Sequence, residues 1–110
     1  MTFSDGQSSL PETPRLNKIY EGPNATVYLH VDHNNRIFIH SVLPDPHKLS
    51  NYKFYKQFLK ELEIQLEERG ATEYYTMADS QMNFDFCTRM GFETAMEVWD
   101  NKYEVMRKAL

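Results

Sequence analysis

The residues best suited to acid–base chemistry are the four histidines and the single cysteine of the chain. His40 and Ser41 belong to a run of mostly apolar residues, so we expect them on a strand. A histidine with a pKa near neutrality could accept a proton there, and His30 and His33 lie nearby in the sequence. Histidines in or beside turns usually have surface or structural roles. His40 and Ser41 are therefore the candidate bases, with a structural role as the alternative.

Other kinds of chemistry find less support in the sequence. No His, Cys, Asp and Glu residues have the spacing of a metal site, and no serine has the context of a nucleophile elbow. A net charge of -4 and a pI of about 5.5 argue against general nucleic-acid binding. A single cysteine fits a reducing compartment, and we find neither a membrane-spanning apolar run nor a signal peptide. These features predict a cytoplasmic protein without membrane contact, although a virus particle would share them.

The candidate residues must be positioned by a small number of elements. The 110 residues suit one small domain. Residues 1–14 are rich in Ser, Thr, Gly and Pro and predict a flexible tail, or an arm that orders on a partner. Residues 15–110 would then form a single α+β domain. Apolar alternation and turn residues predict strands over residues 18–21, 25–31, 36–43, 74–79 and 92–99.

Two helices are expected between these strands. The long one covers residues 50–69 and ends at Gly70, and a short one ends at Gly91. Five residues form the apolar stripe of the long helix: Tyr55, Phe58, Leu59, Leu62 and Leu66. The charges of this helix run against the helix dipole, with lysines first and glutamates last. His47, Lys48 and Lys53 could therefore hold an anion at its start, and the alternative is a solvated charged face.

The segment from Tyr74 to Trp99 carries a family resemblance. Its order is strand, short helix, Gly91-Phe92, strand, and it resembles the C-terminal half of the GCN5-related N-acetyltransferase (GNAT) family. The resemblance extends over residues 19–110. It implies a truncated GNAT-like mixed sheet of about six strands, with one long and one short helix. It also implies that two parallel central strands, near residues 36–42 and 73–78, splay apart.

The resemblance decides one element that periodicity leaves open between helix and strand. The sequence Met106-Arg107-Lys108-Ala109-Leu110 is similar to the final strand of many GNAT domains. We therefore expect a last strand there, with a hairpin turn at residues 100–102. The first strand and two helices of the family are missing, which leaves the acceptor side open or available to another chain.

The family binds acetyl-coenzyme A between a strand end and a glycine-containing phosphate loop. By position, the resemblance implies these cofactor-binding candidates: Val42, Leu43, His47, Lys48, Ser50 and Lys53. Ser50 and Tyr52 occupy the positions of the loop glycines, and a tyrosine there should obstruct close approach of the phosphates. We therefore expect no cofactor, or acetyl-CoA if the chain is an enzyme.

The resemblance also places Cys87 where the family often has a tyrosine that protonates the leaving thiolate. A thiol has a suitable pKa for that role, and the alternative is a small apolar residue on the inner face of the helix. Ser80 and Asn83 stand where the family has asparagine and alanine. The positions that build the fold persist, whereas those that perform the reaction have changed.

Three functions remain open from the sequence. The favoured one is a catalytically degenerate GNAT-fold domain that binds protein or has a structural role, such as a phage virion or inhibitor protein. The second is a minimal acetyl-CoA-dependent N-acetyltransferase with His40 and Cys87 as its catalytic candidates. The third is a small α+β domain, such as a ferredoxin-like one, unrelated to acetyltransferases. Aromatic residues make up 14% of the chain, so we expect an exposed aromatic patch for a protein partner or for self-association.

Overall fold

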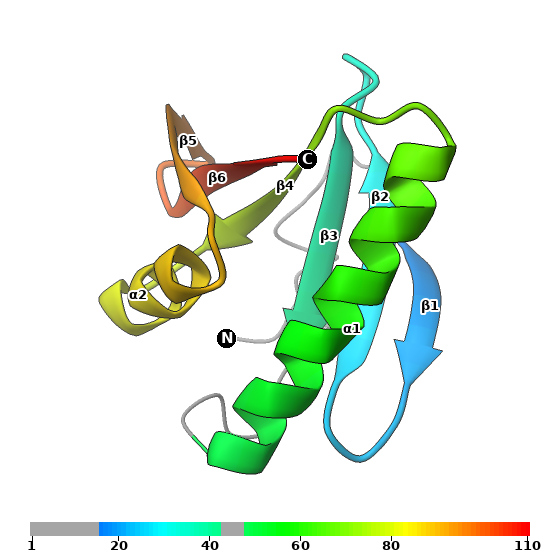
Figure 1. The fold of residues 1–110 in the computed structure, drawn as a ribbon. Coiled ribbons are helices and arrows are strands. Elements are labelled where there is room, and N and C mark those ends of the chain that lie inside the picture. Colours follow the sequence, from blue (N-terminus) through cyan, green and yellow to red (C-terminus); the bar gives the residue numbers. More distant parts are fainter. Residues whose placement is uncertain (1–15, 43–47) are drawn as a thin grey trace.

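The structure, a computed structural model, describes residues 16–42 and 48–110 (Figure 1). The elements are β1 (Asn17–Glu21), β2 (Thr26–Val31), β3 (Ile37–Val42), α1 (Leu49–Glu68), β4 (Glu73–Ala78), α2 (Gln81–Arg89), β5 (Glu93–Trp99) and β6 (Tyr103–Ala109). The predicted α+β fold, with six strands and one long and one short helix, is confirmed. The predicted tail, Leu43 and His47 lie outside the described residues.

The six strands form one mixed sheet in the order β1-β2-β3-β4-β6-β5. β1, β2 and β3 pair antiparallel, and so do β4, β6 and β5. β3 and β4 run parallel and meet at a single register pair, Phe38 with Tyr75. Figure 1 shows these two strands diverging toward their C-terminal ends. The expected splay of the central strands is therefore present.

Both helices pack on one face of the sheet, called here the helix-covered face. Tyr55, Leu59 and Leu66 of the α1 stripe are buried against Ile39 of β3 and Tyr74 of β4. α1 is followed by Gly70 at φ 89°, and α2 is followed by Gly91 at φ 99°. Glycine adopts these left-handed conformations without a steric penalty, which explains why both helices stop where the sequence predicts.

The opposite side of the sheet, called here the outer face, has a core of its own. Phe38, Tyr75, Met77, Tyr103 and Val105 form this cluster, and none of its members comes from a described helix. Successive residues of a strand point to opposite faces, so Phe38 lies on the outer face while Ile39 lies under α1. The sheet is thus apolar on both sides.

The C-terminal segment is a strand, β6, as the family resemblance implied where periodicity could not distinguish helix from strand. β6 pairs with β4 and β5, which makes it an interior strand of the sheet. Asp100 and Asn101 have φ values of 58° and 53°, as a tight hairpin turn with two left-handed residues requires. The amide of Lys102 donates to the carbonyl of Trp99 at 3.1 Å. The predicted turn at residues 100–102 is therefore confirmed.

Candidate functional site

The two catalytic candidates lie on opposite faces of the sheet. Cys87 is half-buried on the inner side of α2, within the core of the helix-covered face. His40 is fully buried on the outer face, where its ring stacks near Phe38. The sheet itself separates these two side chains, so they cannot act as acid and base on one substrate.

Burial also removes the reactivity that each role would need. Burial raises the pKa of the Cys87 thiol to about 12, so the thiol holds its proton at neutral pH. Burial and then neighbouring His30 lower the pKa of His40 to about 3. A group with so low a pKa is a weak base, because the driving force for accepting a proton decreases as the pKa decreases.

His40 belongs to a buried pair with His30 of β2. Nε2 of His40 lies 2.8 Å from Nδ1 of His30, and the two rings stack with centroids 4.7 Å apart. Burial lowers the pKa of His30 to about 4, although the charge of Asp32 opposes this shift. Both rings are therefore neutral at pH 7, and one must donate to the other. His33, by contrast, is exposed in the turn between β2 and β3.

The structure brings together a different set of polar groups beneath the helices. The hydroxyls of Ser41 on β3 and Tyr55 on α1 share a short hydrogen bond. Burial raises the pKa of Tyr55, the bond to Ser41 opposes that rise, and the nearby Cys87 adds to it. Sequence reasoning treated Tyr55 as one residue of an apolar stripe. Its hydroxyl was the available signal, because a buried tyrosine usually requires a hydrogen-bond partner.

The cofactor-binding candidates on α1 are exposed around its first turns. Lys48 caps the helix without a side-chain hydrogen bond, and no acidic residue lies in the first turn. Lys48, Ser50 and Lys53 all face solvent, whereas Val42 is half-buried at the end of β3. Asn51 in the first turn is buried and accepts a 2.9 Å hydrogen bond from Asn24. Lys48, Ser50 and Lys53 thus lie exposed within the first turns of α1.

Arg89 adds a further positive charge near this helix start. Its guanidinium lies 5.6 Å from the ring of Tyr52 and 5.9 Å from the ring of Phe86. Tyr52 belongs to α1 and Phe86 to α2, and their ring centroids are 6.0 Å apart. The positive end of the α1 dipole therefore meets cations rather than the acidic side chains that it prefers. An anion bound at this place would relieve that repulsion.

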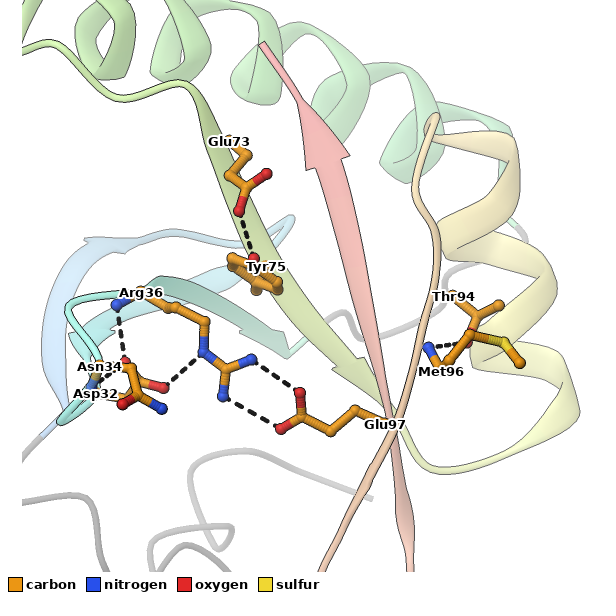
Figure 2. A network of polar contacts seen from close by, with 8 residues as sticks. All are labelled: Asp32, Asn34, Arg36, Glu73, Tyr75, Thr94, Met96 and Glu97. Carbon is orange, nitrogen blue, oxygen red and sulfur yellow. Dashed lines mark hydrogen bonds and ion pairs between the residues drawn. The ribbon is translucent and has the colours of Figure 1, made fainter.

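An ion-pair network crosses the outer face (Figure 2). Arg36 donates from Nε to Asp32 at 2.8 Å and from its two Nη atoms to Glu97 of β5 at 2.9 and 3.2 Å. Its guanidinium lies 5.1 Å from the ring centroid of Tyr75. Partial burial would raise the pKa of Asp32, but hydrogen bonds and charge from Arg36 lower it. The sequence did not predict this network, because Glu97 lies 61 residues from Arg36 in the chain.

The β5 edge, defined here as Met96 and Val98, exposes apolar side chains. Met96 is 87% exposed and has a φ of 57°, and Val98 is 58% exposed. The pairing of β5 with β6 is irregular between Thr94 and Glu97. The amide of Met96 donates to Oγ1 of Thr94 at 3.1 Å, as Figure 2 shows. A β-bulge of this kind redirects a side chain, and here it leaves Met96 in solvent.

A pocket of about 320 Å³ lies beside the β5 edge. Ala78, Phe84 and Val98 supply its apolar lining, and Asp79, Lys102 and Glu104 are the charged residues that line it. These residues come from the end of β4, from α2 and from the β5–β6 hairpin. The pocket therefore joins the exposed apolar edge to the start of α2.

The predicted exposed aromatic patch does not occur within residues 16–42 and 48–110. Of the nine aromatic residues expected to contribute, five are buried (Tyr55, Tyr74, Tyr75, Phe86 and Tyr103) and four are half-buried (Tyr52, Phe54, Phe84 and Trp99). The rings pack against one another, as in the 5.5 Å contact of Tyr20 with Phe54. Mutual packing on both faces of the sheet explains the greater burial. The large apolar residues that are exposed there are aliphatic residues or methionines: Ile19, Val31, Leu49, Ile64, Met82, Met96 and Val98.

No group of three or more His, Cys, Asp or Glu residues in the described ranges could hold a metal ion. None of the described helices combines the length and the apolar composition that crossing a bilayer requires. Compared with known proteins, the chain matches no family model and no curated protein.

Proposed function

We propose that this chain is a catalytically inactive GNAT-like domain that acts as a protein-binding module. The observation that carries the inactive assignment is the placement of His40 and Cys87. They lie on opposite faces of the sheet, and burial keeps both neutral at pH 7. A phage virion or inhibitor protein in a host cytoplasm is the setting that this assignment suits by analogy.

The architecture supports the GNAT-like part of the proposal. The parallel strands β3 and β4 meet only at Phe38 and Tyr75 and then diverge. A long helix connects these two strands, and a short helix with Gly91 after it precedes β5. Unrelated small α+β domains with an unbroken central sheet would pair the two strands along their length.

The β5 edge supports the protein-binding part of the proposal. Apolar side chains clustered in solvent commonly mark interaction surfaces. Met96 and Val98 are exposed on a strand that ends the sheet, and Val98 also lines the neighbouring pocket. The bulge interrupts the ladder that a long added strand would need. We therefore propose contact through these side chains, with a second copy of the chain as the partner to test first.

Two measurements test the proposal separately. Calorimetry with acetyl-CoA is expected to give no binding heat, and micromolar binding would contradict the inactive assignment. Sedimentation over a range of protein concentrations is expected to show self-association that weakens in Met96→Lys and Val98→Lys. Ile64→Lys is the matched control, because Ile64 is 57% exposed on α1 and away from the edge. A chain that stays monomeric at every concentration would contradict self-association through this edge.

The start of α1 favours a second function, a minimal acetyl-CoA-dependent N-acetyltransferase. Lys48, Lys53 and Arg89 are exposed around a helix start without acidic residues. If a coenzyme A phosphate binds there, coenzyme A and pyrophosphate should both raise the melting temperature at low salt. Lys48→Gln and Lys53→Gln should reduce that rise, whereas Lys60→Gln near the middle of the helix should not. No rise with either ligand would exclude this function.

A further inference from the structure

Met96 is an apolar side chain that the β5 bulge holds in solvent. It is 87% exposed at a φ of 57°, a conformation that is unfavourable for a residue with a side chain. Its amide donates to Oγ1 of Thr94, and that hydroxyl donates in turn to Glu104 of β6. Figure 2 shows the Met96 side chain leaving the strand on the side away from Glu97, which faces Arg36. A strained residue that buries so little of its apolar side chain within its own chain indicates a contact made with another molecule.

The pocket beside the β5 edge lies on this same side of the sheet. Ala78, Glu104 and Val98 stand opposite one another across β4, β6 and β5, so their side chains share a face. Phe84, which also lines the pocket, packs against the core of the helix-covered face. Met96 and the pocket are therefore neighbours along one edge, on one side of it.

The pocket has the size and the lining that a methionine side chain needs. A cavity of about 150 Å³ already binds benzene, so a volume of about 320 Å³ admits an unbranched thioether. Met96 of the same chain is not one of the described residues that line it. Asp79 already accepts a hydrogen bond from Asn83, and Glu104 accepts one from Thr94. An apolar and flexible occupant thus leaves these polar groups with partners.

We propose that Met96 of each copy occupies this pocket in a second copy of the chain, so that one twofold contact fills two pockets. The inference rests on the self-association through the β5 edge proposed above, and it names the side chains that meet. A twofold axis perpendicular to the sheet sets the two β5 strands antiparallel and keeps their helix-covered faces on one side. With Glu97 at the axis, Met96 lies opposite Val98 of the other copy. Parallel strands would turn the two faces apart and separate Met96 from the pocket.

The charges at the two ends of β5 fit the antiparallel arrangement. Glu93 begins the strand with a side chain that is 66% exposed, and its Oε1 accepts from Arg107, so Oε2 can accept from a second cation. Lys102 lines the pocket beyond the end of the strand, and it is exposed and forms no ion pair with residues 16–42 and 48–110. An antiparallel register centred on Glu97 sets Glu93 opposite Asn101 of the other copy, next to Lys102. Each copy thereby offers an acid to the ammonium of the other.

The first experiment traps the contact by disulfide formation between copies. Met96→Cys and Gln81→Cys are made in separate full chains, each with Cys87→Ala, and one chain carries a tag that distinguishes its mass. Gln81 is exposed and lines the pocket, so mild oxidation of the mixture should give the mixed disulfide. Met82→Cys is the control, because Met82 follows Gln81 on α2 but is not one of the described residues that line the pocket. Equal yields from the two mixtures would overturn the proposal.

The second experiment blocks the pocket and measures dimerisation by sedimentation. Gln81→Trp places a large ring at the pocket, and Met96→Gln makes the occupant polar. Burial of one methionine strengthens binding about tenfold, and the contact buries two, so each variant should raise the dissociation constant of the dimer about a hundredfold. Met82→Trp adds the same ring outside the pocket and should leave the constant unchanged. All three positions are exposed, so circular dichroism should show the parent fold in each variant.

The outcomes separate this inference from the proposed self-association. A chain that stays monomeric at every concentration contradicts the self-association and the inference with it. A chain that dimerises, but whose Gln81→Trp and Met82→Trp variants dimerise equally well, contradicts only the docking of Met96 in the pocket.

Discussion

On the helix-covered face, Ser41, Tyr55 and Cys87 lie beneath two helices whose apolar periodicity is visible in the sequence. On the outer face, His30 and His40 lie among aromatic side chains. The apolar periodicity of the helices does not predict that these two histidines are buried. Burial raises the pKa values of Tyr55 and Cys87, so both keep their protons at neutral pH. Burial lowers the pKa values of His30 and His40, so neither ring takes up a second proton. The comparison teaches that residue types suited to acid–base chemistry can be held in their neutral forms on both faces of a sheet, because desolvation favours the neutral form in each case.

The largest effect should come from removing one large side chain from each face. Phe38 is 0% exposed on the outer face, and Leu59 is 2% exposed on the buried side of α1. Phe38→Ala should lower the free energy of unfolding by about 3–5 kcal/mol and Leu59→Ala by about 2–5 kcal/mol. Urea unfolding followed by circular dichroism measures both. A much smaller loss for Phe38→Ala would mean that the outer face is open to solvent, and the comparison would fail.

The histidine pair should make the outer face sensitive to acid. An unfolded histidine binds a proton near its ordinary pKa of about 6.5, whereas the folded rings do so only near 4 and 3. Below about pH 6.5 the unfolded state therefore binds more protons than the folded state. The free energy of unfolding is greatest above that pH and decreases as the pH is lowered through it. The slope should reach about 1.4 kcal/mol per pH unit for each histidine.

Urea unfolding at constant ionic strength, from neutral pH down to about 5, measures this slope. Ser41, Tyr55 and Cys87 do not titrate in this interval, so the slope reports on the outer face. His30→Gln should remove that ring's share of the slope, because burial lowers the pKa of His30 in the folded chain. A flat profile would show that the two histidines are accessible to water in the folded chain.

The glycines that end the helices should have smaller effects on the helix-covered face. Both have positive φ, where a side chain costs about 1–2 kcal/mol. A Cβ at Gly91 would lie 3.0 Å from Cε of Lys108, which pairs with Glu63 at 2.7 Å. A Cβ at Gly70 would meet no atom within 4 Å. Gly91→Ala should therefore lower the melting temperature more than Gly70→Ala, and the reverse order would contradict the geometry.

The Arg36–Glu97 ion pair should give the smallest effect. Its side chains are 25% and 45% exposed, so solvent screens the interaction. A double-mutant cycle with Arg36→Gln and Glu97→Gln should yield a coupling energy of about 0.5–1 kcal/mol. The coupling should weaken in high salt. The more exposed pair of Lys18 and Glu21 serves as the control, and a larger coupling there would contradict the ranking.

Local chemistry predicted most of the fold. Gly70 and Gly91, the α1 stripe and the Asp100-Asn101 turn each act within a few residues, so the sequence carries their signal directly. The final strand needed the family resemblance as well, because its periodicity is ambiguous. The bulge at Met96 was missed, since the positive φ of a methionine is not marked by any turn residue.

The site was less predictable than the fold. The sequence correctly predicts that His40 lies on a strand and Cys87 on a helix. It does not predict that the two side chains lie on opposite faces of the sheet. The Ser41–Tyr55 bond and the Arg36–Glu97 pair join residues from different elements, so they depend on the packing of the whole sheet. Aromatic burial was underestimated, because rings on both faces pack against one another.

The single register pair between β3 and β4 divides the main-chain hydrogen bonding of the sheet into two units. One unit contains β1, β2 and β3, and the other contains β4, β6 and β5. Their union depends on side-chain packing rather than on a continuous ladder of amides. Native-state hydrogen exchange should therefore reveal two sets of strand amides with separate opening free energies, so that one half of the sheet can open while the other stays closed.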